Sequence, residues 1–278
     1  MNREEIRDHL SSNGLARVAG KLADAALPSI SIKTDVSTDN NLPIGSSKFG
    51  GLPDSPQGFT WPIWNERPMS FLCQFSLSDI TGLDQDENLP SEGLLSFFYD
   101  SEQSTWGFDP KDRGSWAVQY FESSNLVRNQ FPDELPAESR YNTCALKFAS
   151  ELTLPGRESP LVEELELNDD EDDAFFDSML EGVNHHFLGY AQEVQGAMQL
   201  ECQLASNGIY CGDPSGYADP RVTELEPGAS EWRLLLQIDT DENPDWMWGD
   251  SGMLYFWIKS NDLRSRDFTK IWMVLQCC

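Results

Sequence analysis

The chain has 278 residues, of which 39% are hydrophobic and 24% charged, a composition typical of a folded globular protein. Its 19 Lys and Arg residues stand against 47 Asp and Glu residues, which gives a formal net charge of −28 at pH 7. This charge repels phosphate backbones and anionic membranes, so nucleic-acid and membrane partners are disfavoured. It favours a basic protein partner, or serves solubility alone.

Residues 1–28 predict an N-terminal helix. Apolar residues recur near helical spacing, and the SSNG run at residues 11–14 interrupts them, which predicts one interrupted helix or two short ones. Pro28 ends the pattern, and residues 30–33 alternate as a short strand. The first residues lack the pattern of a secretory signal, and no apolar run is long enough to span a membrane, so we expect a cytoplasmic protein.

Lys48 lies in a loop rich in Gly and Pro, residues 45–62. Its neighbours Gly50 and Gly51 suggest a phosphate-binding loop, but the Walker spacing is missing, so a structural turn is the better interpretation. Lys48 is still kept as a candidate ligand-binding residue.

Residues 231–257 contain two apolar runs, LLLQI at 234–238 and MLYFW at 253–257, on either side of an acidic turn. Short aliphatic and aromatic runs separated by turn residues predict neighbouring β-strands.

An earlier part of the chain repeats this arrangement. FLCQF at residues 71–75 and LLSFFY at 94–99 again flank an acidic connection, with Gln in the fourth position of the first run and Gly before the second. FGGLP at residues 49–53 has a weaker counterpart in LGYA at residues 188–191. This self-similarity predicts an internal duplication, with β-sheet halves at residues 45–150 and 183–278.

An acidic connecting segment, residues 158–182, lies between the two predicted halves. Residues 158–181 contain eleven Asp or Glu and no basic residue, but apolar residues remain among them. A helix with an acidic outer face, or two helices flanking a turn at residues 168–173, is therefore expected. Repulsion between like charges leaves a mobile insertion as the alternative.

Two motifs resemble known functional motifs, a calcium loop and a protease nucleophile, but each lacks a residue that the function requires. Residues 239–245 place oxygen ligands at alternate positions as a calcium loop does, but Pro244 stands where that loop needs Gly and Asp250 where it needs Glu, so an acidic hairpin loop is the default interpretation. The tetrapeptide GDSG at residues 249–252 surrounds the nucleophile of chymotrypsin-like proteases, but Ser251 has no evident histidine base, so a tight turn is expected.

The histidines and cysteines also give no complete site. His185 and His186 are adjacent and do not readily bind one metal ion, and the six cysteines show no C-x-x-C spacing, so reduced and partly buried thiols are expected. We predict no catalytic residue, no metal ligand and no cofactor. The sequence does not indicate an oligomeric state.

The nine tryptophans are mostly expected in the core. Those in turn-rich segments are expected to be partly exposed and to line a pocket between the two halves. The candidate ligand-binding residues are Lys48, Trp106, Asp109, Trp246, Trp248 and Asp250.

Taken together, several motifs resemble the YwqG-like family of bacterial proteins, a domain of unknown function. They are SKFGGLP at residues 47–53, FLCQ at 71–74, WGFD at 106–109, LLLQ at 234–237 and WGDSGMLYF at 248–256. The resemblance implies a single strand-rich α+β domain and assigns no catalytic residue. Some members lie near secreted bacterial toxins, which implies a protein-binding or immunity role.

We therefore predict an α+β, strand-rich fold, with two duplicated β-sheet halves forming one globular domain, an N-terminal helix and an acidic helical insertion. The first functional hypothesis is a non-enzymatic protein that binds a basic partner, including a basic toxin. The alternative is a binding domain or an enzyme, with a site for a small molecule or a divalent metal at the aromatic loops between the halves.

Overall fold

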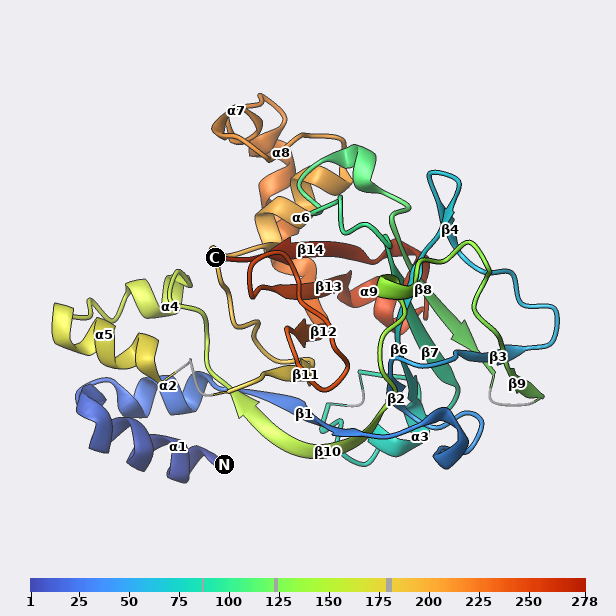
Figure 1. Cartoon of the computed structure of the whole chain (residues 1–278). Coiled ribbons are helices and arrows are strands. Elements are labelled where there is room, and N and C mark those ends of the chain that lie inside the picture. The colour runs from blue at the N-terminus through green and yellow to red at the C-terminus, as the bar shows by residue number, and fades with distance from the viewer. Residues whose placement is uncertain (87, 123–124, 179–181) are drawn as a thin grey trace.

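One antiparallel β-sheet of ten strands, curved until it is nearly closed, forms the body of the molecule (Figure 1). The computed structural model describes residues 1–86, 88–122, 125–178 and 182–278. In spatial order the strands are β14 (Trp272–Gln276), β13 (Met253–Lys259), β12 (Trp232–Asp239), β11 (His185–Phe187), β1 (Leu27–Val36), β10 (Cys144–Thr153), β2 (Lys48–Phe49), β6 (Ser70–Ser76), β7 (Leu94–Tyr99) and β8 (Trp116–Phe121).

The long strands β1 and β10 form the middle of the sheet. They pair from Leu27 opposite Thr153 to Val36 opposite Cys144. Four strands follow on each side, β11 to β14 beyond β1, and β2, β6, β7 and β8 beyond β10. The pairing register shifts after Phe71 in β6 and after Leu234 in β12, which is three residues before the Gln of each strand.

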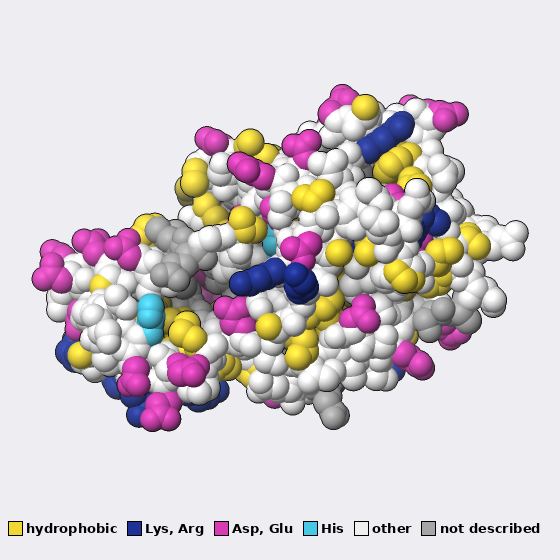
Figure 2. Space-filling view, turned by 60° about the horizontal axis from the view of Figure 1, so that its bottom comes forward, with side chains coloured by type: hydrophobic (Ala, Val, Ile, Leu, Met, Phe, Trp, Pro, Cys, Tyr) yellow, Lys and Arg dark blue, Asp and Glu magenta, His cyan; other side chains and the backbone are white. Residues whose placement is uncertain are grey.

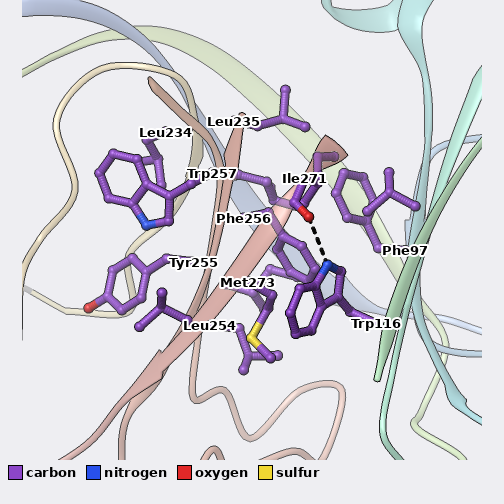
Figure 3. Close-up of a cluster of buried hydrophobic side chains, with 14 of the residues drawn as sticks. Phe97, Trp116, Leu234, Leu235, Leu254, Tyr255, Phe256, Trp257, Ile271 and Met273 are labelled. Atoms are coloured by element: carbon purple, nitrogen blue, oxygen red, sulfur yellow. Dashed lines mark hydrogen bonds between the residues drawn. The ribbon is translucent and has the colours of Figure 1, made fainter. Parts of the chain in front are cut away.

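The two ends of the sheet meet in the core (Figure 3). The Trp116 indole of β8 donates a hydrogen bond to the Ile271 carbonyl at 3.0 Å, and its ring lies 5.0 Å from the ring of Trp272. Phe97 of β7 and Phe256 of β13 meet edge to face at 5.0 Å. Aromatic pairs of this geometry add to the stability gained by burial, so they hold the curved sheet together.

The predicted strands at residues 234–238 and 253–258 are confirmed as β12 and β13, which pair with one another. All six residues from Met253 to Ile258 are buried. Strands covered on both faces have continuous apolar runs instead of alternating ones, which is why these two are evident in the sequence.

A helical lobe lies beside the sheet (Figure 1). It comprises α1 (Arg3–Leu10), a π turn at Ser11–Leu15, α2 (Ala19–Ala25), α4 (Pro160–Glu163) and α5 (Asp169–Asp177). Gly14, with φ of 93°, separates α1 from α2, which confirms the predicted interruption.

The described part of the acidic segment, residues 158–178, contains the helices α4 and α5 and packs on these N-terminal helices. Residues 179–181 of that segment lie outside the described residues. Val162, Leu165 and Phe175 share a buried cluster with the apolar residues of α1 and α2. The expected turn at residues 168–173 is wrong, because Asn168 caps α5 and the acidic residues after it form the first turns of that helix. Carboxylates are stabilised near a helix N-terminus, which favours this arrangement.

The remaining elements cover the sheet and connect its strands. Two small ladders are β3 (Asp54–Pro56) with β9 (Leu126–Arg128) and β4 (Ile63–Trp64) with β5 (Arg67–Pro68). The other α-helices are α3 (Leu77–Ile80), α6 (Gln199–Ser206), α7 (Pro214–Tyr217), α8 (Val222–Leu225) and α9 (Ser260–Arg264). Turns of 3-10 helix lie at Asp39–Asn41, Pro110–Asp112, Ala137–Ser139, Glu226–Glu231 and Phe268–Lys270.

The strand-rich, mixed α and β architecture predicted from the sequence is confirmed. Over the described ranges, no helix has both the length and the apolar character needed to cross a membrane.

Candidate functional site

Trp246 and Trp248 belong to the core. Their side chains are 4% and 0% exposed, and both indoles donate to the Asp239 carbonyl, at 2.9 and 3.2 Å. Tyr141 packs edge to face on both rings. The predicted partial exposure of these tryptophans is wrong, because the loop that carries them folds inward over the sheet.

Lys48 lies at the centre of a buried ionic cluster, which we call the Lys48 cluster: Asp39, Lys48, Asp54 and Arg128. The Lys48 ammonium, fully buried, donates to Asp39 Oδ1 at 2.7 Å and to the Leu52 carbonyl. Arg128 donates to both Asp54 oxygens, at 2.9 and 3.2 Å. Burial lowers the pKa of Lys48, whereas the Asp39 carboxylate opposes that shift. The carboxylates of Asp39 and Asp54 balance the positive charges of Lys48 and Arg128. Because Lys48 makes its hydrogen bonds within the protein, its role is to hold the loop in place.

The other three candidate residues do not meet in one pocket. Trp106 is half-buried against Phe108, and its carbonyl accepts the Leu275 amide at 3.0 Å. Asp109 caps a 3-10 turn by accepting the Lys111 amide. Asp250 is exposed in the turn before β13.

The acidic loop after β12 is filled by protein donors. Asp241 accepts from His185 at 3.1 Å, from the Thr34 hydroxyl at 2.7 Å and from the Asn243 amide at 2.9 Å. The Asp239 carboxylate accepts the Asn184 amide. Within the described residues, no three His, Cys, Asp or Glu side chains come together as metal ligands.

The paired histidines are fixed by hydrogen bonds. His185 Nδ1 accepts the Asp239 amide at 2.9 Å, so in the neutral ring Nε2 carries the proton and donates to Asp241. His186 lies 3.0 Å from the Tyr190 carbonyl through Nε2 and 2.9 Å from Asn184 through Nδ1. Neither ring has a free nitrogen with which to act as a base for Ser251.

Four of the six thiols are also unsuited to nucleophilic chemistry. Burial raises the pKa of Cys144 and Cys211 to about 12, and that of Cys73 and Cys202 well above the ordinary value. The thiolate is the reactive form, so these four cysteines are inert near neutral pH.

A cavity of about 220 Å³ opens between the helical lobe and the sheet, and we call it the interlobe cleft. Its apolar wall includes Ile6 and Leu10 of α1 and Leu152 of β10, and its polar lining includes Glu151, Thr153, Asn184, His186, Tyr190 and Gln192. No short motif predicted it, because it is assembled from three distant segments. The resemblance of residues 188–191 to residues 49–53 was the one available signal.

Hydrogen bonds around the cleft match those around the Lys48 cluster. The Leu52 amide donates to Asp39 at 3.0 Å, and the Tyr190 amide donates to the Thr153 hydroxyl at 2.8 Å.

The side chains that begin these two loops correspond as well. Lys48 bonds to the carbonyl four residues later, that of Leu52, and His186 bonds to the carbonyl of Tyr190. Asp39, Lys48, Leu52 and Asp54 thus correspond to Thr153, His186, Tyr190 and Gln192.

The fold and its polar clusters define a strand-rich α+β domain with an interlobe cleft. In the described residues, the three histidines and the four inert thiols form no catalytic triad. The chain belongs to the family described as domain of unknown function DUF1963, whose family model matches residues 47–277. No curated protein matches the chain.

Proposed function

We propose that the protein is a non-enzymatic binding protein that engages a basic protein partner through its acidic surface. The observation that carries this proposal is the row of exposed carboxylates on the helical lobe. They belong to Glu158, Glu163, Glu164, Glu166, Asp169, Asp170, Asp173 and Asp177. Acidic side chains also gather on this lobe, at the left of the molecule, in Figure 2. A surface of one sign attracts a partner of the opposite sign and raises its association rate.

The order of the lobe supports a role in recognition. Arg17 forms a bidentate ion pair with Glu171 at 2.8 and 2.6 Å, and Arg157 pairs with Asp172. These pairs and the apolar cluster beneath them hold the helices that carry the remaining carboxylates in place. A rigid charged face loses little conformational entropy when it binds.

Our proposal includes an evolutionary and a cellular part. We infer that the sheet halves arose by internal duplication, which the matching strand order on both sides of β1 and β10 supports. The motifs in residues 47–53 and 248–256 support a YwqG-like bacterial protein. Unpaired cysteines support a cytoplasmic location, where immunity to a basic toxin is one form that binding would take.

A pull-down with the immobilised full chain tests the binding function, at low and moderate salt. One triple variant carries Glu163→Gln, Glu164→Gln and Asp173→Asn on the helical lobe. The matched control carries Glu134→Gln, Glu138→Gln and Asp133→Asn, which removes three exposed charges elsewhere.

The expected result is capture of a partner rich in Lys and Arg, with affinity at least tenfold lower for the lobe variant and nearly unchanged for the control. Recovery of no protein partner from the native lysate would sink the proposal. Equal losses in the two triple variants would remove the helical lobe as its surface.

A further inference from the structure

We propose that the interlobe cleft binds the guanidinium group of an arginine side chain from the basic partner. This inference rests on the proposed function and names the site at which that partner is recognised. It follows from the correspondence between the cleft and the Lys48 cluster.

In the first half of the sheet, an arginine of the chain itself occupies the corresponding place. The Arg128 guanidinium donates to both carboxylate oxygens of Asp54, to the Asp39 carbonyl, and to the Leu42 carbonyl at 3.1 Å. A planar group with five donors is thereby surrounded by acceptors on one carboxylate and the neighbouring backbone.

In the second half, the corresponding residues line an open cavity. Gln192 stands where the first half has Asp54, and Thr153 stands where it has Asp39. Across the described part of the chain, no arginine side chain donates a hydrogen bond to Gln192 or Thr153, and the Gln192 side-chain oxygen accepts the Asn184 side-chain amide at 2.7 Å instead. No arginine of the chain therefore fills the counterpart of the Arg128 position.

The charges of the cleft suit one incoming cation. In the Lys48 cluster, two carboxylates balance Lys48 and Arg128. In the cleft, His186 replaces Lys48 and is neutral near pH 7, because burial lowers its pKa to about 4. One carboxylate, that of Glu151, lines the cavity and lies two strand positions from Thr153, on the same face of β10. The lining therefore offers one carboxylate to an incoming guanidinium, and Met1 and His9 lie in the same cavity wall.

The size of the interlobe cleft and its apolar wall suit an arginine side chain. A cavity of about 220 Å³ is smaller than the roughly 300 Å³ at which pockets for drug-sized ligands begin. Ile6, Leu10 and Leu152 provide apolar surface for the methylene stem of an arginine.

Calorimetric titration of the full chain tests this site with three defined probes. Two are twelve-residue peptides of alternating Gly with either Arg or Lys, which have equal charge, and the third is N-acetyl-L-arginine amide. Glu151→Gln is the cleft variant, and Glu138→Gln removes the same charge from an exposed position outside the helical lobe.

We expect the Arg peptide to bind at least fivefold more tightly than the Lys peptide. Glu151→Gln should reduce this preference below twofold, whereas Glu138→Gln should retain it. Unchanged thermal melting of both variants checks that they fold.

Equal binding of the two peptides, or equal effects of the two substitutions, would overturn the cleft site but leave the acidic-surface function standing. Binding of N-acetyl-L-arginine amide alone, with neither peptide bound, would make the cleft a small-molecule site and overturn a partner's arginine as its occupant. If the partner captured by pull-down binds without any loss in Glu151→Gln, the cleft is likewise excluded from its recognition.

Discussion

Gln74 of β6 and Gln237 of β12 each fix a loop with the same pair of hydrogen bonds. The two strands lie on opposite sides of the central pair β1 and β10. The Gln74 amide donates to the Ser46 carbonyl and its side-chain oxygen accepts the Asp54 amide, each at 2.8 Å. Gln237 makes the corresponding bonds to Asn184 and Gln192, also at 2.8 Å. The shared Gln noticed in the sequence is therefore a structural residue that fixes the loop after β2 or β11.

Replacing either glutamine with leucine should destabilise the fold by similar amounts. Gln74→Leu and Gln237→Leu each leave a buried backbone amide and carbonyl without partners, at roughly 1–3 kcal/mol for each group. Chemical denaturation measures the loss. Gln119→Leu is the control, because the Gln119 side-chain oxygen is buried without a hydrogen-bond partner and should cost little. A large loss in Gln119→Leu, or a loss at only one of the two strands, would contradict this account.

Trp248→Ala should lower the free energy of unfolding. The indole is fully buried and donates to the Asp239 carbonyl, so its removal leaves a large cavity and should cost about 3–5 kcal/mol. Its neighbour Met247 is 54% exposed, and Met247→Ala should change the free energy of unfolding by less than about 0.5 kcal/mol. Thermal and urea unfolding of the two variants give the comparison. Similar melting of Trp248→Ala and wild type would show that the loop is not part of the core.

The sequence predicted those parts of the fold that have a local signal. Strands β12 and β13 are buried on both faces and therefore have continuous apolar runs. The short strands β2 and β11 have two and three residues, too few for any periodicity, and only their place between longer strands defines them.

The candidate site could not be predicted because the residues that form its main contacts are far apart in the sequence. Arg128 and Asp54 pair across 74 positions, so Lys48 looked like an isolated charge in a glycine-rich loop. Trp246 and Trp248 lie among turn residues, which are usually at the surface, and tertiary packing reverses that preference. The interlobe cleft needs α1 placed against β10, and no motif predicts this contact.

Cys278 should be the only thiol that reacts quickly in the folded protein. It is exposed, whereas the other five cysteines are buried. A disulfide reagent at pH 8 should label one thiol per chain rapidly and the rest only after unfolding, because reaction requires an accessible thiolate. Cys278→Ser should abolish the rapid phase, and Cys211→Ser should leave it unchanged. More than one rapid thiol would indicate that a buried cysteine becomes accessible in the native state.

His186 should make the fold less stable as the pH falls from about 6.5 to about 4. Burial lowers the pKa of its imidazole from 6.5 to about 4, so in this window the unfolded chain binds a proton that the folded chain does not. Stability therefore rises with pH across the window, by roughly 2–3 kcal/mol for a shift of this size. The difference in unfolding free energy between wild type and His186→Gln, measured from pH 4 to pH 7, isolates this contribution from other groups. A His186 proton resonance that titrates near pH 6.5 would show that burial does not lower its pKa, and would remove this contribution to the pH dependence.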